Sequence, residues 1–212
     1  SMLEAEAAVE SALLEEANRI NDSGLPGALL SWQVHLRYVT DTALPRSDER
    51  AAGLCNALGY HLNAIADYLS AKPYFERALA ILVQTGRPAE TAMVESNYSS
   101  LLGELGRRPE AILFGKLAVN RLQKMRVGMA TLESALQQSF LKSKAHIYRA
   151  LADQLIGAGR LPEAQQILAM FKEQEYFDFV RRDTGNDPRT SEASFFGIEQ
   201  KFHREYELLV EG

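Results

Sequence analysis

Cysteine and long hydrophobic runs are scarce in this chain of 212 residues, and each scarcity excludes a class of protein. The single cysteine, Cys55, can form neither an internal disulfide nor a Cys-rich zinc site, which fits a reducing compartment. No run approaches the roughly 18 apolar residues that span a bilayer, and the acidic N-terminus lacks the basic region of a signal peptide. We therefore expect a cytoplasmic protein without membrane partners.

Strand signals are also nearly absent, since the chain contains no Asn-Gly or Asp-Gly hairpin turn and no sustained period-2 alternation. Apolar residues instead recur at spacings of three and four, which predicts helices that each bury one stripe. Two such stripes are Leu58, Leu62, Ile65 and Leu69, and then Tyr74, Leu79, Leu82 and Val83.

The breaks between the expected helices carry Gly and Pro in a recurring order. In three of them, Gly supplies a left-handed cap and Pro comes next at the first turn of the following helix, where its missing N–H is not needed. Such short connections predict antiparallel helix hairpins. The five breaks are Asp22-Ser23-Gly24, Leu44-Pro45-Arg46-Ser47, Gly86-Arg87-Pro88, Gly106-Arg107-Arg108-Pro109 and Gly159-Arg160-Leu161-Pro162.

A repeated pattern joins these hairpins. Leu58-Gly59, Tyr68, Ala71, Phe75 and Ala78-Leu79 follow the order of small and aromatic residues that resembles a tetratricopeptide repeat. Gly and Ala are expected where helices cross closely, while Phe75 fills the space toward the neighbouring pair. Two further copies, and a degenerate one near Gly24, Ala28 and Trp32, align with it on the anchors Ala71, Ala111 and Ala164.

The anchors lie 40 and 53 residues apart, more than the roughly 34 of the simple repeat, and we expect the excess to lengthen helices before the third copy. The predicted fold is all-α: a right-handed tetratricopeptide-like superhelix of antiparallel hairpins, with three clear repeats, a degenerate N-terminal one and a C-terminal helix. We expect the repeat domain over residues 2–183, a loop over 184–194 and the last helix over 195–212.

The third copy and the segment directly after it, residues 151–183, resemble the last tetratricopeptide unit before the peptidase in bacterial CHAT-domain proteins. In that family the repeats are a regulatory, partner-sensing portion, which precedes a caspase-like domain with a catalytic His and Cys. The resemblance implies that this chain is the N-terminal part of a longer protein that ends before such a domain.

Candidate catalytic chemistry is weak. Cys55 and His61 are the one pair typical of a thiol nucleophile, but six residues on one helix separate them by about one and a half turns. Cys55 also holds a packing position, so we expect it to be buried and structural. We predict no catalytic, cofactor or metal site, because the four histidines have no partner at ligand spacing.

The preferred function is therefore a non-catalytic scaffold that binds a protein or peptide. In a tetratricopeptide superhelix the first helix of each pair lines the concave groove, and its outward positions are the expected contacts. A solvated groove wall is about as good an interpretation for each residue taken singly. The predicted groove residues are Asn56, Tyr60, Asn63, Ser96, Ser100, Arg149 and Asp153.

The uneven distribution of charge along the chain supports a second candidate function. Residues 1–24 hold six acids and one cation, whereas residues 107–149 hold nine cations and two acids, a net charge of +7 in a chain of −5 overall. Uneven solvated helix faces are the plainer interpretation of this distribution. The alternative is a sensor that binds nucleic acid or a ribonucleoprotein through a basic patch. The patch residues are Arg121, Lys124, Arg126, Lys142 and Lys144.

Overall fold

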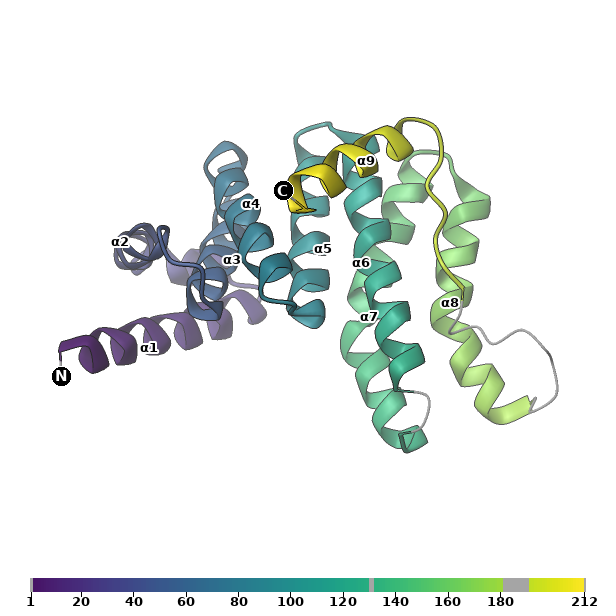
Figure 1. Cartoon of the computed structure of the whole chain (residues 1–212), viewed down its shortest axis with the longest axis horizontal. Coiled ribbons are helices and arrows are strands. Elements are labelled where there is room, and N and C mark those ends of the chain that lie inside the picture. The colour runs from purple at the N-terminus through teal and green to yellow at the C-terminus, as the bar shows by residue number, and fades with distance from the viewer. Residues whose placement is uncertain (1, 130–131, 181–190, 212) are drawn as a thin grey trace. The chain divides into compact units, whose positions relative to one another are not determined.

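The computed structural model describes residues 2–129, 132–180 and 191–211, and gives residues 2, 3, 26, 134, 172–180 and 209–211 by their backbone alone. Every regular element in these ranges is a helix, as predicted. The chain forms two compact units, Ser1–Arg87 and Pro88–Gly212 (Figure 1). The boundary falls at a predicted Gly-to-Pro break, inside the stretch 2–183 that we expected as one repeat domain. None of the described helices is long and apolar enough to cross a bilayer.

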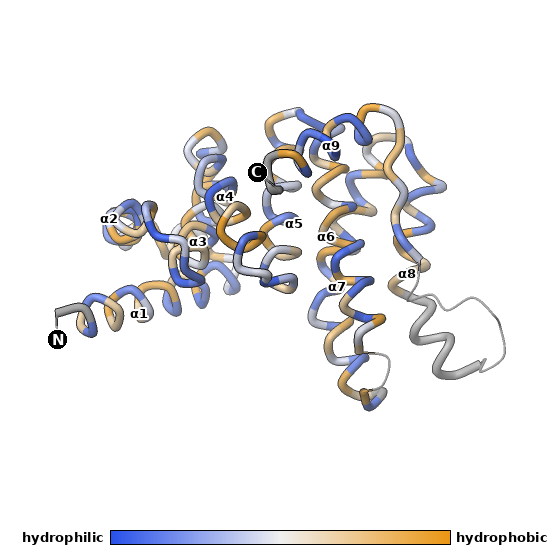
Figure 2. Tube along the Cα trace, in the orientation of Figure 1, coloured by the Kyte–Doolittle hydropathy of each residue, from blue (hydrophilic) through white to orange (hydrophobic). Residues whose placement is uncertain are grey.

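The first unit contains five helical elements. They are α1 (Met2–Asp22), the 3₁₀ helix η1 (Pro26–Leu29), α2 (Gln33–Ala43), α3 (Glu49–Ala64) and α4 (Tyr68–Gln84). Helix α3 packs against α1, α2 and α4 and is the centre of the unit. Hydrophobic and hydrophilic residues alternate along α1 (Figure 2), as expected of a helix that buries one stripe.

The second unit contains α5 (Pro88–Glu104), α6 (Arg108–Gly128), α7 (Ser134–Gly157), α8 (Leu161–Val180) and α9 (Ile198–Glu211). Helices α5 and α6 form one pair and α7 and α8 another, and α7 packs on both α5 and α6. Helices α6 and α7 have 21 and 24 residues against 17 in α5, so the long interval before the third copy does lengthen helices, as predicted. The core between them includes Leu122, Tyr148, Leu151, Leu155 and Ile167.

The helix ends confirm the predicted breaks. Gly86, Gly106 and Gly159 come after α4, α5 and α7 with φ of 66°, 73° and 73°, the left-handed conformation that favours glycine. Pro88 is the first residue of α5, and Pro occupies the second position of α6 and α8, where it leaves no hydrogen bond unmade. The chain can therefore reverse direction within three residues.

One predicted stripe is wrong at its end. The turn between α3 and α4 carries no glycine, and Ala66 adopts the left-handed φ of 64° instead. This turn changes the helical phase, so Leu69, which we expected to be buried with Leu58 and Leu62, is 79% exposed. Asp67 begins α4 by accepting a hydrogen bond from the Ser70 backbone N–H at 3.4 Å.

The predicted close crossing of helices occurs at Gly59. A Cβ atom on Gly59 of α3 would lie 3.1 Å from ring carbons of Phe75 in α4, whose side chain is fully buried. The absence of a side chain at Gly59 is thus what lets the Phe75 ring lie flat against α3.

Replacing Gly59 by Val should therefore destabilise the first unit. We expect a loss of about 1–3 kcal/mol in the free energy of unfolding, because the added methyl groups overlap the Phe75 ring in a packed core. Denaturant unfolding monitored by circular dichroism measures this loss. Gly157→Val is the matched control, since a Cβ there meets no atom within 4 Å, and equal stability of the two variants would contradict the prediction.

Candidate functional site

The three predicted groove residues of the first unit share one face of α3. Asn56, Tyr60 and Asn63 are separated by four and three residues, which keeps them on one stripe. Tyr60 is 39% exposed, whereas Asn56 is 9% exposed and Asn63 is half-buried. The Asn63 Oδ1 atom is buried and has no hydrogen-bond partner among the described residues. The stripe therefore offers one exposed aromatic surface, whereas the Asn63 acceptor is not accessible to a ligand.

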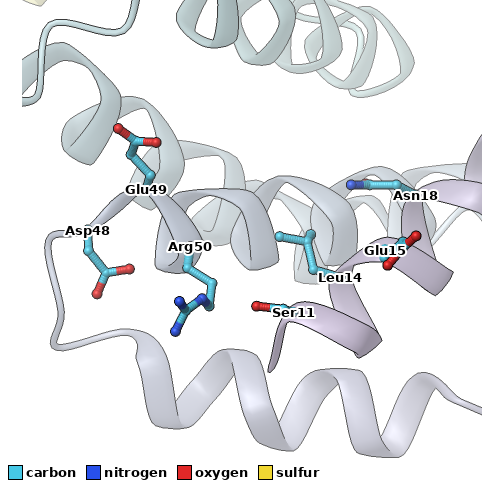
Figure 3. A pocket seen from close by; sticks show the side chains of 7 residues that line it. All are labelled: Ser11, Leu14, Glu15, Asn18, Asp48, Glu49 and Arg50. Carbon is cyan, nitrogen blue, oxygen red and sulfur yellow. The ribbon is translucent and has the colours of Figure 1, made fainter. Parts of the chain in front are cut away.

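An open pocket of about 980 Å³ begins on the same side of α3 (Figure 3). Helix α1 lines it with Ser11, Leu14, Glu15 and Asn18, and the start of α3 lines it with residues 48–50. Glu49 and Gly53 continue the stripe of Asn56 toward this pocket in steps of four and three residues. The pocket was not found from the sequence, because its α1 wall mixes polar, acidic and apolar residues that form no motif.

A buried carboxylate fixes the pocket wall. Glu10 of α1 accepts hydrogen bonds from Arg46 at 2.6 Å and from Arg50 at 3.3 Å. The Arg46 hydrogen bond, aided by Arg50, holds the pKa of Glu10 below its usual value although partial burial opposes this. The carboxylate is charged at neutral pH, and the resulting ion pairs hold the start of α3 against α1.

The groove residues predicted in the second unit are less available. Ser96 is 7% exposed, and the Ser100 hydroxyl donates to the Ser96 carbonyl of its own helix at 3.2 Å. The Arg149 guanidinium lies over the Phe171 ring at 5.6 Å from its centroid, which engages it with α8. Asp153 is exposed. These four side chains therefore do not form a polar cluster comparable with that of the first unit.

Fewer of the five predicted basic-patch residues are exposed than the sequence implies. Arg126 is 3% exposed and donates to Gln123 and to the Met170 carbonyl, so it belongs to the core rather than to the surface. Arg121 pairs at 2.7 Å with Glu95, which is fully buried. Lys124 and Lys142 are exposed and Lys144 is half-buried.

A third cation of the basic middle, Lys116, is also buried. Its ammonium group donates to Glu163 at 2.6 Å, to Glu199 at 2.8 Å and to the Ser194 carbonyl at 2.6 Å. Lys116 and Glu199 are each 1% exposed, and Arg160 donates to both carboxylates. Part of the +7 net charge of residues 107–149 is therefore buried, where acidic or other polar groups of the protein pair with it.

Lys116 is one of three buried polar residues of α6 that hold the segment before α9. Asn120 exchanges two hydrogen bonds with the Ala193 backbone, at 2.9 and 2.6 Å, and Gln123 donates to the Ser191 carbonyl at 3.0 Å. Lys116, Asn120 and Gln123 are spaced by four and three residues, so they line one face of α6. This buried polar stripe was a missed signal in the sequence. The predicted loop 184–194 lies outside the described residues up to 190.

Helix α9 continues this attachment across α6, as the yellow ribbon in Figure 1 shows. The Phe114 ring of α6 lies between Tyr98 of α5 and Tyr206 of α9, with ring centroids 4.8 and 5.3 Å away. Both contacts are edge-on, the geometry that aromatic quadrupoles favour. The C-terminal helix therefore packs on α6, the second helix of its pair.

Cys55 is buried in α3, as predicted. Burial raises the pKa of its thiol to about 12, and this outweighs the opposite effect of Arg77, a nearby cation that the sequence did not indicate. His61 is fully buried, its Nε2 lies 3.1 Å from the Gln33 Oε1 atom, and burial lowers its pKa. No cluster of three potential metal ligands occurs among the described residues.

Comparison with known proteins adds little. No family model matches the chain, and no curated protein matches it. The crystal structure of BtubC (BKLC) from P. vanneervenii aligns with 93% of this chain and 99% of that chain, at 15% sequence identity and a TM-score of 0.38. A similarity at this level supports no conclusion about fold or function.

The Lys116 cluster predicts how the C-terminal segment can be released. Glu199→Ala leaves the buried ammonium with one fewer carboxylate, a loss of about 3 kcal/mol, the lower end for breaking a buried ion pair. We expect amide hydrogens of residues 191–208 to exchange roughly 100-fold faster. Hydrogen exchange measured by mass spectrometry tests this.

Glu192→Ala is the control for that experiment. Glu192 lies in the same segment, but its contact with Lys124 is exposed and 3.9 Å long, so its removal should leave exchange nearly unchanged. Equal exchange rates in Glu199→Ala and in the unmodified chain would show that the cluster does not hold the segment.

Proposed function

We propose that this chain is a non-catalytic scaffold of tetratricopeptide type that binds an extended peptide segment of a partner protein along the α1–α3 face of its first unit. The observation that carries the proposal is the α3 stripe, where exposed Tyr60 lies in line with Asn63 and with the open pocket beside α1. Tyr60 would supply an aromatic contact surface to the peptide.

The packing of the second unit supports the tetratricopeptide part of this proposal. Each short connection reverses the chain, and α7 contacts both members of the preceding pair, as in repeat proteins whose hairpins stack on their neighbours. The CHAT-type assignment remains part of the proposal and rests on the resemblance of residues 151–183. In that setting the scaffold would be the partner-sensing segment of a bacterial, cytoplasmic protein with a downstream caspase-like domain.

Selection from a random dodecamer peptide display library tests the binding site. We expect the immobilised chain to enrich a family of peptides, and Tyr60→Ala to weaken binding of the enriched peptide by about tenfold, the loss typical of removing an aromatic anchor. Fluorescence anisotropy of the labelled peptide measures the affinity.

Tyr38→Ala is the matched control, because Tyr38 is an exposed tyrosine on α2 and is not part of the α3 stripe. The proposal would be contradicted if the library selection enriched no peptides. It would also be contradicted if the enriched peptides bound Tyr60→Ala as tightly as the unmodified chain. A labelled oligouridylate in low salt serves as a counter-screen. Binding that falls steeply with salt and is lost in Lys142→Ala would favour the nucleic-acid alternative instead.

A further inference from the structure

The first unit has a second exposed surface, on the opposite side of α1 from the pocket in Figure 3. Four exposed small apolar residues of α1 recur at helical spacing, which places them on one face. Beside them, α2 and the residue before it expose Trp32, Val34 and Tyr38, the last two by 74% each. The α1 residues are Ala5, Ala8, Val9 and Ala12.

An apolar cleft of about 570 Å³ joins the two helices on this face. Val9, Ala12 and Leu13 of α1 form one wall, and Trp32, Tyr38 and Val39 at α2 form the other. A large aromatic residue exposed beside an open apolar cleft is unusual for a surface that faces only water. We call these two walls the α1–α2 cleft.

The shape of this surface suits a helix better than a small molecule. The exposed stripe continues beyond the cleft to Ala5, so from Ala5 to Glu16 it runs for about 17 Å along α1. Two adjacent helices present a groove into which side-chain ridges of a third helix fit, and alanines on α1 allow its close approach. A small ligand would leave most of this stripe exposed.

The charge around the α1–α2 cleft determines the kind of helix. Residues 1–24 hold six acids and one cation. Glu16 lines the cleft but is paired with Arg19 at 2.6 Å. The acidity of this surface therefore comes from Glu6 and Glu15, which are exposed along the edges of the α1 stripe. The eight described lining residues include no Lys or Arg. A second copy of the chain would bring the same acidic helix and be repelled, whereas a basic helix would be attracted.

We propose that the α1–α2 cleft binds an amphipathic helix of a partner protein, with an apolar stripe between Val9 and Trp32 and with Lys or Arg residues along its edges. This surface is separate from the α3 stripe, so the two sites can be occupied and tested independently. Apolar contact provides the affinity, and the acidic α1 selects basic partners.

Trp32 is the one tryptophan of the chain and lies in the cleft, so its fluorescence reports on occupancy. The probe is a synthetic 16-residue helix of Leu and Lys, with Leu at positions i, i+3, i+4 and i+7. We expect saturable binding with a blue shift of the Trp32 emission and protection of Trp32 from acrylamide. Ala12→Gln, which adds a neutral polar side chain to the apolar stripe, and Tyr38→Ala should each weaken binding by about tenfold.

Matched controls separate this site from general attraction to an acidic protein. Tyr60→Ala should bind the probe unchanged, and so the result is independent of the α3 stripe. A peptide of the same composition without the apolar stripe, and a Leu/Glu counterpart, should not shift Trp32. Circular dichroism verifies that the exposed substitutions leave the helices folded.

Three outcomes would overturn the proposal. The first is no change in Trp32 emission on addition of the probe. The second is that the control peptides bind as tightly as the probe, or that Ala12→Gln and Tyr38→Ala both bind the probe as tightly as the unmodified chain. The third is sedimentation that shows self-association of the chain alone with Trp32 already shielded, which would make a second copy the occupant.

Discussion

An amphipathic helix must cover its apolar stripe, because apolar surface left in water costs free energy. Both units of this protein reflect that constraint. In the second unit, the polar stripe of α6 and the Phe114 ring receive the C-terminal segment and α9. In the first unit, the outer face of α1 and α2 stays exposed, with Trp32 and Tyr38 at its cleft. The face of α6 is covered by a segment of the same chain, whereas the apolar face of α1 and α2 is left exposed.

The charged residues of this molecule fall into two groups, those buried in the second unit and those on the surface. Lys116, Arg126 and Glu95 are buried within the second unit, and each makes hydrogen bonds there, because a buried charge without a partner would be costly. The acids of α1 are largely on the surface, where they act through long-range attraction and repulsion. Summing charges along the sequence mixes these two populations. The net charge of a sequence segment therefore does not give the charge that this segment presents at the surface.

The sequence predicted the helices and their ends well because those depend on local chemistry. Gly86, Gly106 and Gly159 adopt the left-handed conformation expected of them, and Gly59 permits the close contact with Phe75. Leu69 was misjudged because Ala66 supplies a turn without a glycine. The partners of Lys116 lie 47 and 83 residues away, and no local pattern indicates contacts at that separation. Tyr60 was identified by its helical register, whereas the α1 wall of the pocket became visible only in three dimensions.

Because Cys55 is buried, the reactivity of this single thiol reports the opening of the first unit. A thiol reagent reaches Cys55 only when α3 separates from its neighbours, because the side chain has no exposed surface in the folded state. The rate of modification therefore measures how often the unit opens, and at what free energy, without denaturant. Since Cys55 is the one thiol of the chain, a single thiol-specific label distinguishes molecules that have opened from those that have not.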